Sequence, residues 1–580
     1  MKLSPYLFLA AGAIVVAGPH RAAADAQIDS WLKVYSGKYA RIYTDASAQS
    51  AGNAVSTWSN GSQTQSLPAY SGVQEVYSSA NWVYLRTTGL GSHVMGPWST
   101  GFPNLPANQH VFYRIPRTPS VPASRTLTGL GAIGYFVDGV AMFDSRDAFY
   151  WNGTSETQGT GSWNREAYVN ESSTFDPAFA HQENTGTYHY HANPIALRYL
   201  LGDHVDYNSG TKTYGESATA VTKHSPILGW VRDGYPIYGP YGYSSASNSA
   251  SGIRRMTSGF QLRNGQRGSD NLTSSGRSTI PAWAVRAYAI SAGQSGPAVS
   301  GSYPLGRYME DNAYLGDLGY VQGVDFDLDE YNGRFCFTPE FPSGTYAYFV
   351  SLTAAGAPSF PYNIGRSFYG SPTGASVTSL AETVTTNFVG GGSAETRVRA
   401  PAVAGGTVTL VWSSVEGGGY RVESSTTLTN WATNTTVASQ GLTTQTATNA
   451  GAGNQFFRVV RASLASFDGV TGGTTGGGGG IVSVSPTSGT RGSVVTLTIN
   501  LDSAAQPSPP PQNAPINSVT VGTISGTSLT HVSQTQVRAS ISIPGGAATG
   551  AQTVTVVFPG PPENPTATVT YTLNGGFTVQ

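Results

Sequence analysis

Cysteine and charge are both scarce in this chain. Cys336 is the only cysteine among 580 residues, which excludes an internal disulfide. Asp, Glu, Lys and Arg make up 11% of the sequence, against roughly 25% in an average globular protein. With a formal net charge of −1, the chain has no basic field to attract a phosphate backbone or an anionic lipid surface. We therefore expect no nucleic-acid partner.

Long hydrophobic runs are lacking beyond the first residues of the chain. No later stretch reaches the about 18 consecutive apolar residues that indicate a membrane helix, so we expect no membrane span. The N-terminus itself carries a short apolar run, residues 6–17, after the positive Lys2 and before Ala22-Ala23-Ala24. This pattern predicts a signal peptide over 1–24, cleaved near Ala24, and a secreted or periplasmic protein.

Glycine and tyrosine are abundant, with 72 and 32 residues, and hydrophobic residues make up 39% of the chain. This composition is typical of exported β-proteins, and the length favours three or four domains. Short β-prone runs separated by turn residues predict an all-β fold class. These runs include 82–88, 110–115, 133–143, 344–352 and 407–414. One helix is expected over 193–201, where Asn193 would be the N-cap, Pro194 lies in the first turn and Gly202 ends the helix.

Two glycine tracts, 390–392 and 472–480, divide the chain because they offer almost no side chains to bury. We expect a large β-rich N-terminal domain followed by two small Ig-like β-sandwich domains. The predicted order is a signal peptide over 1–24, the N-terminal domain over 25–375, a linker over 376–396, an Ig- or fibronectin-like sandwich over 397–466, a Gly-rich linker over 467–480 and a second sandwich over 481–580.

The last domain resembles an IPT/TIG Ig-like module. Its opening strand, the turn Pro486-Thr487-Ser488-Gly489 and the alternating strand that follows carry this resemblance. Both small domains together hold a single histidine, His531, so we interpret them as spacers or adhesive modules.

Histidines cluster in the N-terminal domain: seven of the nine lie between positions 93 and 224. His189 and His191 stand two apart in the run TYHYH. On a strand, residues two apart share a face with side chains roughly 7 Å apart, which lets two imidazoles converge on one ion. Metal sites need three or four ligands, and His181 and His224 are the candidates to complete the set.

A structural interpretation stands beside the metal site. Histidines in a tyrosine-rich sheet also serve as hydrogen-bond donors to carbonyl groups, and we favour that role for His93, His110 and His204. For the metal interpretation, neutral imidazoles suit copper or zinc, and Glu183 is a candidate carboxylate ligand or proton shuttle.

Three long motifs carry a family resemblance: GTYHYHANP (186–194), HSPILGWVRDGYPIYGPYGY (224–243) and LDEYNGRFCFTPEFPSGTYAYFVS (328–351). They resemble the signature segments of the bacterial YHYH-domain family, which is named for the tetrapeptide at 188–191. The resemblance covers roughly 90–370 and implies the identity of the domain and an exported setting. It implies no particular reaction.

Three further features of the sequence bear on its chemistry. Asp325, Asp327 and Asp329 alternate as in a calcium loop, but Glu330 stands where such a loop needs glycine, so a solvated acidic turn competes with calcium. Asp233 belongs to an Asp-Gly turn and is a weaker candidate to orient a ligating histidine. Cys336 alternates with two phenylalanines, which favours a buried thiol over a copper ligand.

The sequence thus supports two functions. The first is an exported metal-binding protein, with copper or zinc held by His189, His191, His181 and His224. The second is a non-catalytic envelope or matrix protein whose aromatic surface contacts polysaccharide. The hydrolase motif GxSxG near a strand-to-helix turn, the metalloprotease motif HExxH and the phosphate-binding P-loop are missing. Whether the protein is an enzyme stays open at this point.

Overall fold

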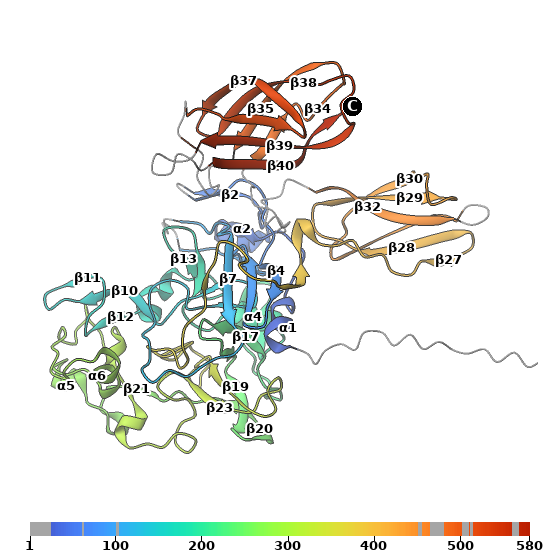
Figure 1. Ribbon diagram of the computed structural model, residues 1–580. Helices are drawn as coiled ribbons and strands as arrows, with labels where there is room; N and C mark the ends of the chain where they lie inside the picture. The colour runs from blue at the N-terminus through green and yellow to red at the C-terminus, as the bar shows by residue number, and fades with distance from the viewer. Residues whose placement is uncertain are drawn as a thin grey trace, which may run out of the picture. The chain divides into compact units, whose positions relative to one another are not determined.

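The computed structural model describes residues 25–60, 63–99, 104–450, 455–464, 481–501, 510, 514–559 and 568–580 (Figure 1). The predicted signal peptide, 1–24, and the predicted Gly-rich linker, 467–480, lie outside the described residues. The chain forms two compact units, Met1–Gly472 and Gly473–Gln580. Strands predominate in both units, which confirms the all-β fold class.

An eight-stranded mixed sheet forms the centre of the first unit. In spatial order its strands are β13 (Ala180–Gln182), β14 (Tyr188–Tyr190), β9 (Ala141–Met142), β8 (Gly134–Phe136), β17 (Ile227–Val231), β18 (Pro236–Tyr238), β24 (Thr345–Phe349) and β23 (Gly333–Cys336). Most of their side chains are buried, because the sheet is covered on both faces. The runs predicted as strands at 133–143, 188–191 and 344–352 all lie in this sheet, with β8 and β9 joined by a turn at Asp138-Gly139.

A five-stranded antiparallel sheet packs in the same core. Its order is β25 (Ala375–Ser376), β7 (Val111–Pro116), β5 (Trp82–Thr87), β4 (Val73–Ser78) and β26 (Thr385–Val389). Here the predicted linker over 376–396 is wrong. Strand β26 pairs with β4, and the Phe388 ring packs against Tyr35 with 4.8 Å between ring centroids. Threonine, phenylalanine and valine favour extended backbone, which suits 385–389 to a strand at the edge of the sheet.

Smaller elements surround the two sheets. A three-stranded sheet consists of β11 (Glu156–Gln158), β10 (Arg146–Trp151) and β12 (Asn164–Glu166). The two-stranded pairs are β1 (Arg41–Ile42) with β6 (Val94–Met95), β2 (Trp58–Asn60) with β3 (Gln63–Gln65), β15 (Val205–Asn208) with β16 (Thr213–Glu216), β19 (Tyr241–Ser245) with β20 (Asn248–Arg255) and β21 (Phe260–Leu262) with β22 (Asn312–Tyr314).

The α-helices are short. They are α1 (Ala26–Asp29), α2 (Ala46–Ala51), α3 (Ala167–Glu171), α4 (Ile195–Leu200), α5 (Leu272–Ser275) and α6 (Ala282–Tyr288). Helix α4 follows β14 as predicted, but its N-cap is Pro194 and not Asn193. The Asn193 side chain instead accepts a hydrogen bond from the buried Arg198 guanidinium. Gly202 follows the helix with a positive φ of 71°, which suits the expected helix stop. Within the described residues, no helix has the length and apolar character to cross a membrane.

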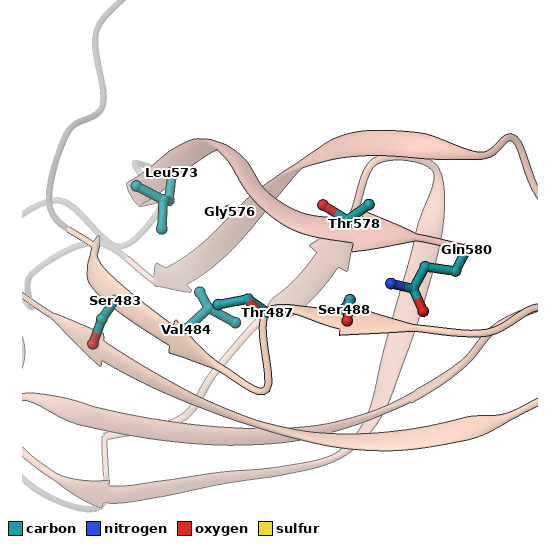
Figure 2. A pocket seen from close by; sticks show the side chains of 8 residues that line it. All are labelled: Ser483, Val484, Thr487, Ser488, Leu573, Gly576, Thr578 and Gln580. Carbon is teal, nitrogen blue, oxygen red and sulfur yellow. The ribbon is translucent and has the colours of Figure 1, made fainter. Parts of the chain in front are cut away.

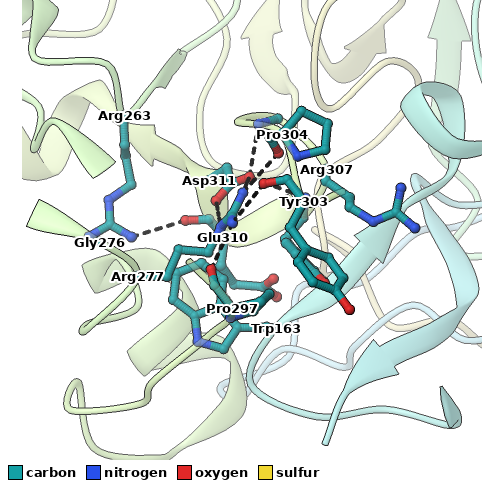
Figure 3. Close-up of polar contacts among 12 residues, drawn as sticks. Trp163, Arg263, Gly276, Arg277, Pro297, Tyr303, Pro304, Arg307, Glu310 and Asp311 are labelled. Carbon is teal, nitrogen blue, oxygen red and sulfur yellow. Dashed lines mark hydrogen bonds and ion pairs between the residues drawn. The ribbon is translucent and has the colours of Figure 1, made fainter. Parts of the chain in front are cut away.

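A second core lies beside the three-stranded sheet and contains Trp163, Trp283 and Tyr308. Figure 3 shows the buried ion pair that crosses this region. Arg277 Nε and Nη2 each donate to the Asp311 carboxylate at 2.7 Å, and both side chains have no exposed surface. The same guanidinium also donates to the carbonyls of Pro297, Tyr303 and Pro304, so the buried charge is fully hydrogen-bonded.

The middle module consists of two three-stranded antiparallel sheets with a small core around Trp412 and Tyr420, as expected for a β-sandwich. One sheet contains β27 (Ala402–Ala404), β28 (Thr407–Ser413) and β31 (Thr443–Asn449), and the other β30 (Ala432–Ala438), β29 (Gly418–Ser425) and β32 (Phe456–Leu464). The module contacts the preceding part of the same unit. Tyr39 donates its backbone N–H to the Glu416 carboxylate, and the Tyr70 hydroxyl donates to the Glu416 carbonyl, both at 2.7 Å.

The second unit is an antiparallel sheet with one parallel pair, wrapped around its own core. Its order is β33 (Ile481–Ser485), β35 (Val494–Leu501), β38 (Gln536–Ser542), β37 (Ile524–Ser533), β36 (Ser518–Val521), β39 (Gly550–Pro559), β40 (Thr568–Val579) and β34 (Ser488–Gly489). Figure 2 shows a hollow where β33 and β34 meet the end of β40. It is lined by Ser, Thr, Val, Leu, Gly and Gln and has no titratable side chain, so it offers no acid, base or metal ligand.

Candidate metal centre

The edge of the eight-stranded sheet brings three histidines together. Strands β13 and β14 are antiparallel neighbours, and their register places His181 directly opposite His189. His191 follows β14 immediately and lies on the same face as His189, because successive side chains of a strand alternate between faces. The prediction that 188–191 is extended, with its two histidines on one face, is confirmed.

The three imidazoles converge on one point. His189 Nε2 lies 3.1 Å from His191 Nε2, and ligand atoms of His181, His189 and His191 all lie within 4.8 Å of one another. The three residues are 2–7% exposed, so each ring is almost fully withdrawn from solvent. In the described part of the chain, this is the one group of three or more histidine, cysteine or acidic residues spaced to hold a metal ion.

Hydrogen bonds at the outer nitrogens orient two of the rings. His189 Nδ1 lies 2.8 Å from the Thr187 carbonyl, and His191 Nδ1 lies 2.7 Å from the Asp144 carbonyl. A carbonyl only accepts, so in both rings Nδ1 carries the proton and donates it. In the neutral form of each imidazole, the lone pair is then on Nε2, which is the atom that faces the centre.

The third ring is held in the same way through a hydroxyl. His181 Nδ1 lies 2.8 Å from Thr174 Oγ1, and that hydroxyl donates to the Glu171 carbonyl at 2.6 Å. Because the Thr174 proton is used in the bond to the carbonyl, its oxygen accepts from His181 Nδ1. In their neutral forms, all three histidines therefore present an unprotonated Nε2 to the centre.

Glu171 adds a carboxylate to this group. It is the last residue of α3, and its Oε2 lies 3.1 Å from His191 Nε2 and 3.5 Å from His181 Nε2. Helix α3 begins at Glu166, whose buried carboxylate accepts from the backbone N–H groups of Tyr168 and Val169 and so fixes the start of the helix. Five residues later, the same short helix delivers Glu171 to the histidines.

The pKa values in the cluster reflect burial and mutual contact. Burial would raise the pKa of Glu171, but His191 and His181 outweigh it, and the pKa lies well below the ordinary value. Burial lowers the pKa of His189 strongly and that of His181 as well, with the neighbouring imidazoles adding to the shift. For His191 the Glu171 carboxylate outweighs burial and raises the pKa.

Aromatic rings frame the site. Phe143 stacks on His189 with 3.8 Å between ring centroids, and Phe175 lies beside His181 at 4.8 Å. These rings limit the movement of the imidazoles and exclude water from one side of the centre. The site opens instead onto a cavity of about 700 Å³, lined by the three histidines together with Phe143, Arg146, Asp147, Glu171 and Glu183.

The other face of β14 is structural. Tyr188 and Tyr190 have no exposed surface, and the Tyr188 hydroxyl donates to Asp176 at 2.7 Å. His93 Nε2 lies 3.0 Å from the same hydroxyl, and burial lowers the pKa of His93 to about 3. His93 therefore belongs to a buried hydrogen-bond network, as the sequence led us to favour.

His224 and Glu183, two predicted members of the site, are placed differently. His224 lies outside the three-histidine group: its Nδ1 bonds to the Ser225 carbonyl at 2.7 Å, and its ring packs against Tyr238 and Tyr243. Glu183 lines the cavity, but its carboxylate accepts from the Thr185 and Thr187 backbones. Glu171 takes the position beside the imidazoles that we expected for Glu183.

The three alternating aspartates act separately. Asp327 is buried and accepts from both terminal nitrogens of Arg254, at 2.6 and 2.7 Å. Asp325 accepts from the Val321 backbone, while Asp329 accepts from the Tyr346 hydroxyl and two backbone N–H groups. A calcium loop is therefore not formed, because each carboxylate already binds a different partner.

Asp233 and Cys336 make their contacts with residues outside the three-histidine group. Asp233 is a buried turn residue that accepts from the Tyr348 hydroxyl at 2.6 Å, and burial raises its pKa to about 6. Cys336 is a free, buried thiol whose pKa burial raises. Both fit the structural interpretations of the sequence.

Comparison with known proteins agrees with the motifs around the site. No curated protein matches the sequence. Residues 112–360 match the family described as YHYH protein, and this span contains Glu171 and all three converging histidines. The chain therefore carries a YHYH domain over residues 112–360.

Proposed function

We propose that the protein binds one metal ion between His181, His189 and His191, with Glu171 beside it. The contact between His189 Nε2 and His191 Nε2 carries this proposal. When both imidazoles are neutral, each nitrogen holds a lone pair toward the other at 3.1 Å, since both Nδ1 atoms donate to carbonyls. Two buried acceptors at this distance repel unless a cation lies between them.

The spacing suits a first-row transition metal. Nitrogens 3.1 Å apart, each about 2.05 Å from one ion, subtend an angle of about 100°, close to the tetrahedral value. Two tetrahedral ligands at that bond length are about 3.3 Å apart, so the widest pair, within 4.8 Å, closes by a shift of at most about 1.5 Å. Three imidazoles and a carboxylate favour zinc or copper over calcium or magnesium.

Coordination by Glu171 distinguishes a closed metal site from one with an open position toward the cavity. If Glu171 coordinates, the ion has four protein ligands and a structural or storage role; if it does not, the fourth position faces the cavity. Three imidazoles with one open position are typical of catalytic zinc. The geometry supports metal binding directly, and catalysis only through this open position.

A proton is the alternative cation. Protonated at Nε2, His191 would donate to both His189 and Glu171, each 3.1 Å away, and the raised pKa of His191 is consistent with this. In that case the cluster is a structural network. The rival function, an envelope or matrix protein that contacts polysaccharide through aromatic side chains, would then be favoured.

Export and the role of the modules complete the proposal. A signal peptide over 1–24 would direct the chain to the periplasm or outside the cell, where the metal centre would operate. The two β-sandwich modules, the last similar to IPT/TIG domains, would act as spacers or adhesive units. N-terminal sequencing of protein recovered from the culture medium or periplasm should start near Asp25.

Metal content tests the proposal. Wild-type protein from medium supplemented with copper and zinc is dialysed and analysed by mass spectrometry for metals. We expect close to one equivalent in wild type and far less than one in the His189→Ala/His191→Ala variant. His224→Ala is the matched control, since this histidine lies outside the cluster, and it should retain the metal.

Folding is checked in parallel by circular dichroism, so that loss of metal is not confused with loss of structure. Wild-type protein that is folded but free of metal would overturn the proposal and favour the hydrogen-bonded network.

A further inference from the structure

A second cavity borders the metal-site cavity through one shared side chain. It has a volume of about 570 Å³, within the range of small-molecule sites. Its polar lining consists of Thr128, Arg146, Thr160, Ser162, Tyr288, Gln294 and Arg366. Arg146 lines both cavities, so the second cavity lies next to the proposed metal centre.

Two buried arginines are the distinctive feature of this cavity. Arg146 and Arg366 are only 3% and 5% exposed. Arg146 donates from Nη1 to the Gly159 carbonyl at 2.9 Å, and Arg366 donates to Thr128. Within the described residues, the Nε of each guanidinium has no hydrogen-bond partner. A buried donor without a partner on a charged group is costly, and an anion in the cavity would offset this cost by pairing with the guanidinium groups.

The acidic side chains nearby do not fully neutralise the positive charges of Arg146 and Arg366. The Asp144 carboxylate lies 3.8 Å from Arg366 Nη1. Asp147, the other acid close to Arg146, is paired with Arg165 at 2.8 Å, and in the described part of the chain Arg146 has no ion-pair partner. Burial lowers the pKa of Arg146, and although Asp144 opposes this shift, the nearby like charge of Arg366 adds to it. One positive charge is thus left over at the cavity wall.

Glu310 does not supply the missing charge from inside the cavity. It accepts from the Tyr288 hydroxyl at 2.6 Å and from Asn164 at 2.8 and 2.9 Å, so its carboxyl group faces away into the second core. Burial also raises its pKa to about 7, which leaves it only partly ionised near neutral pH.

We propose that this cavity binds the oxyanion group of a small molecule, a carboxylate or a phosphate. Guanidinium groups recognise both because their N–H donors are arranged in a plane that matches two oxygen atoms. The hydroxyls of Thr160 and Ser162 add donors around the same space. This site stands on the arginines alone. The same molecule would reach the metal ion past Arg146, and this second step rests on the proposed function as well.

Thermal unfolding with added anions tests the site. The full-length protein is titrated with sodium phosphate and, separately, with sodium acetate, each against sodium chloride at equal ionic strength. We expect phosphate, acetate or both to raise the melting temperature in a saturable way that chloride does not reproduce. A response to one anion alone identifies that group as the ligand.

Two substitutions locate the response. Arg366→Gln should weaken anion binding at least 10-fold. Since loss of a buried arginine can also impair folding, Ser162→Glu provides an independent test: it places a carboxylate in the cavity, so the anion response should vanish while the melting temperature without anions stays equal to or above wild type. Arg198→Lys changes an equally buried arginine that is already paired with Asp203 and Glu216, and should retain the response.

The two proposals fail separately. The His189→Ala/His191→Ala variant should keep its anion response even without metal, because neither histidine lines the second cavity. No anion-specific response in wild type, or an undiminished response in folded Ser162→Glu protein, would overturn the anion site and leave the metal centre unaffected.

Discussion

Thr174 offers a sharp test of how the protein holds the third imidazole. Its hydroxyl connects His181 Nδ1, at 2.8 Å, with the Glu171 carbonyl, at 2.6 Å. It therefore positions a histidine and the carboxylate-bearing residue without touching the centre itself. Thr174→Val keeps the shape of the side chain and removes both hydrogen bonds.

The expected loss follows from the role of such outer hydrogen bonds. Removing the partner of a ligating histidine typically weakens metal binding about 10- to 100-fold, which corresponds to about 1.4 to 2.7 kcal/mol. The freed His181 Nδ1 can then exchange its proton with Nε2, and the ring can rotate out of position. The metal-free protein loses two hydrogen bonds, worth about 1 kcal/mol each.

Competition with a chromophoric chelator measures the affinity, and unfolding with and without zinc measures the stabilisation by metal. If Thr174 positions His181, the increase in unfolding free energy that zinc produces should be smaller in Thr174→Val than in wild type. This decrease would come in addition to any loss of stability in the metal-free protein. The control is Thr345→Val on β24, near the other end of the sheet, where the hydroxyl donates to the neighbouring Tyr346 carbonyl. Equal metal affinity in Thr174→Val and wild type would refute the reasoning.

Two further predictions concern stability. Ending the chain after residue 472 should leave the unfolding of the first unit unchanged. Ending it after residue 384 removes β26 and the Phe388 packing, and should lower the free energy of unfolding by at least about 2 kcal/mol. Equal melting temperatures for the two truncations would contradict the pairing of β26. Burial lowers the pKa of His93 to about 3, so below pH 6.5 the unfolded chain binds a proton that the folded protein does not, and stability falls as pH falls. The stability advantage of wild type over His93→Gln in denaturant unfolding should then shrink by about 2 kcal/mol between pH 6.5 and 5, and a constant difference would show that His93 is not buried in its neutral form.

Local pattern was sufficient to predict the strands and the orientation of the histidine pair. Alternation has a period of two in a strand, so the tetrapeptide at 188–191 could be assigned two faces from the sequence alone. The same pattern identified β5, β7, β24, β28 and β35 at their observed positions. These predictions succeed because they depend on neighbouring residues and not on how distant segments meet.

The remaining site residues could not be predicted, because their positions depend on contacts between segments far apart in the sequence. Glu171 precedes His189 by 18 residues and lies on a helix of five, so no spacing rule connects it with the histidines. His224 belongs to the same cluster of histidines along the sequence, but β17, which follows it, lies three strands away from β14 in the sheet. The linker prediction failed for a related reason. The glycines at 390–392 indicate only that the backbone is locally flexible. The contacts of Glu416 with Tyr39 and Tyr70 join segments far apart in the sequence, which a local pattern does not reveal.

Asp176 shows how the two faces of β14 depend on each other. Its Oδ2 accepts from the Tyr188 hydroxyl, and its Oδ1 accepts from the backbone N–H of Ala180 at 3.2 Å. These two partners lie on β14 and β13, each next to a converging histidine: Tyr188 precedes His189, and Ala180 precedes His181. The buried carboxylate therefore fixes the distance between the strands that carry the imidazoles. On this argument the tyrosines of the tetrapeptide set the register and the histidines bind the ion, so a change at Tyr188 should affect the metal centre although its side chain points away from it.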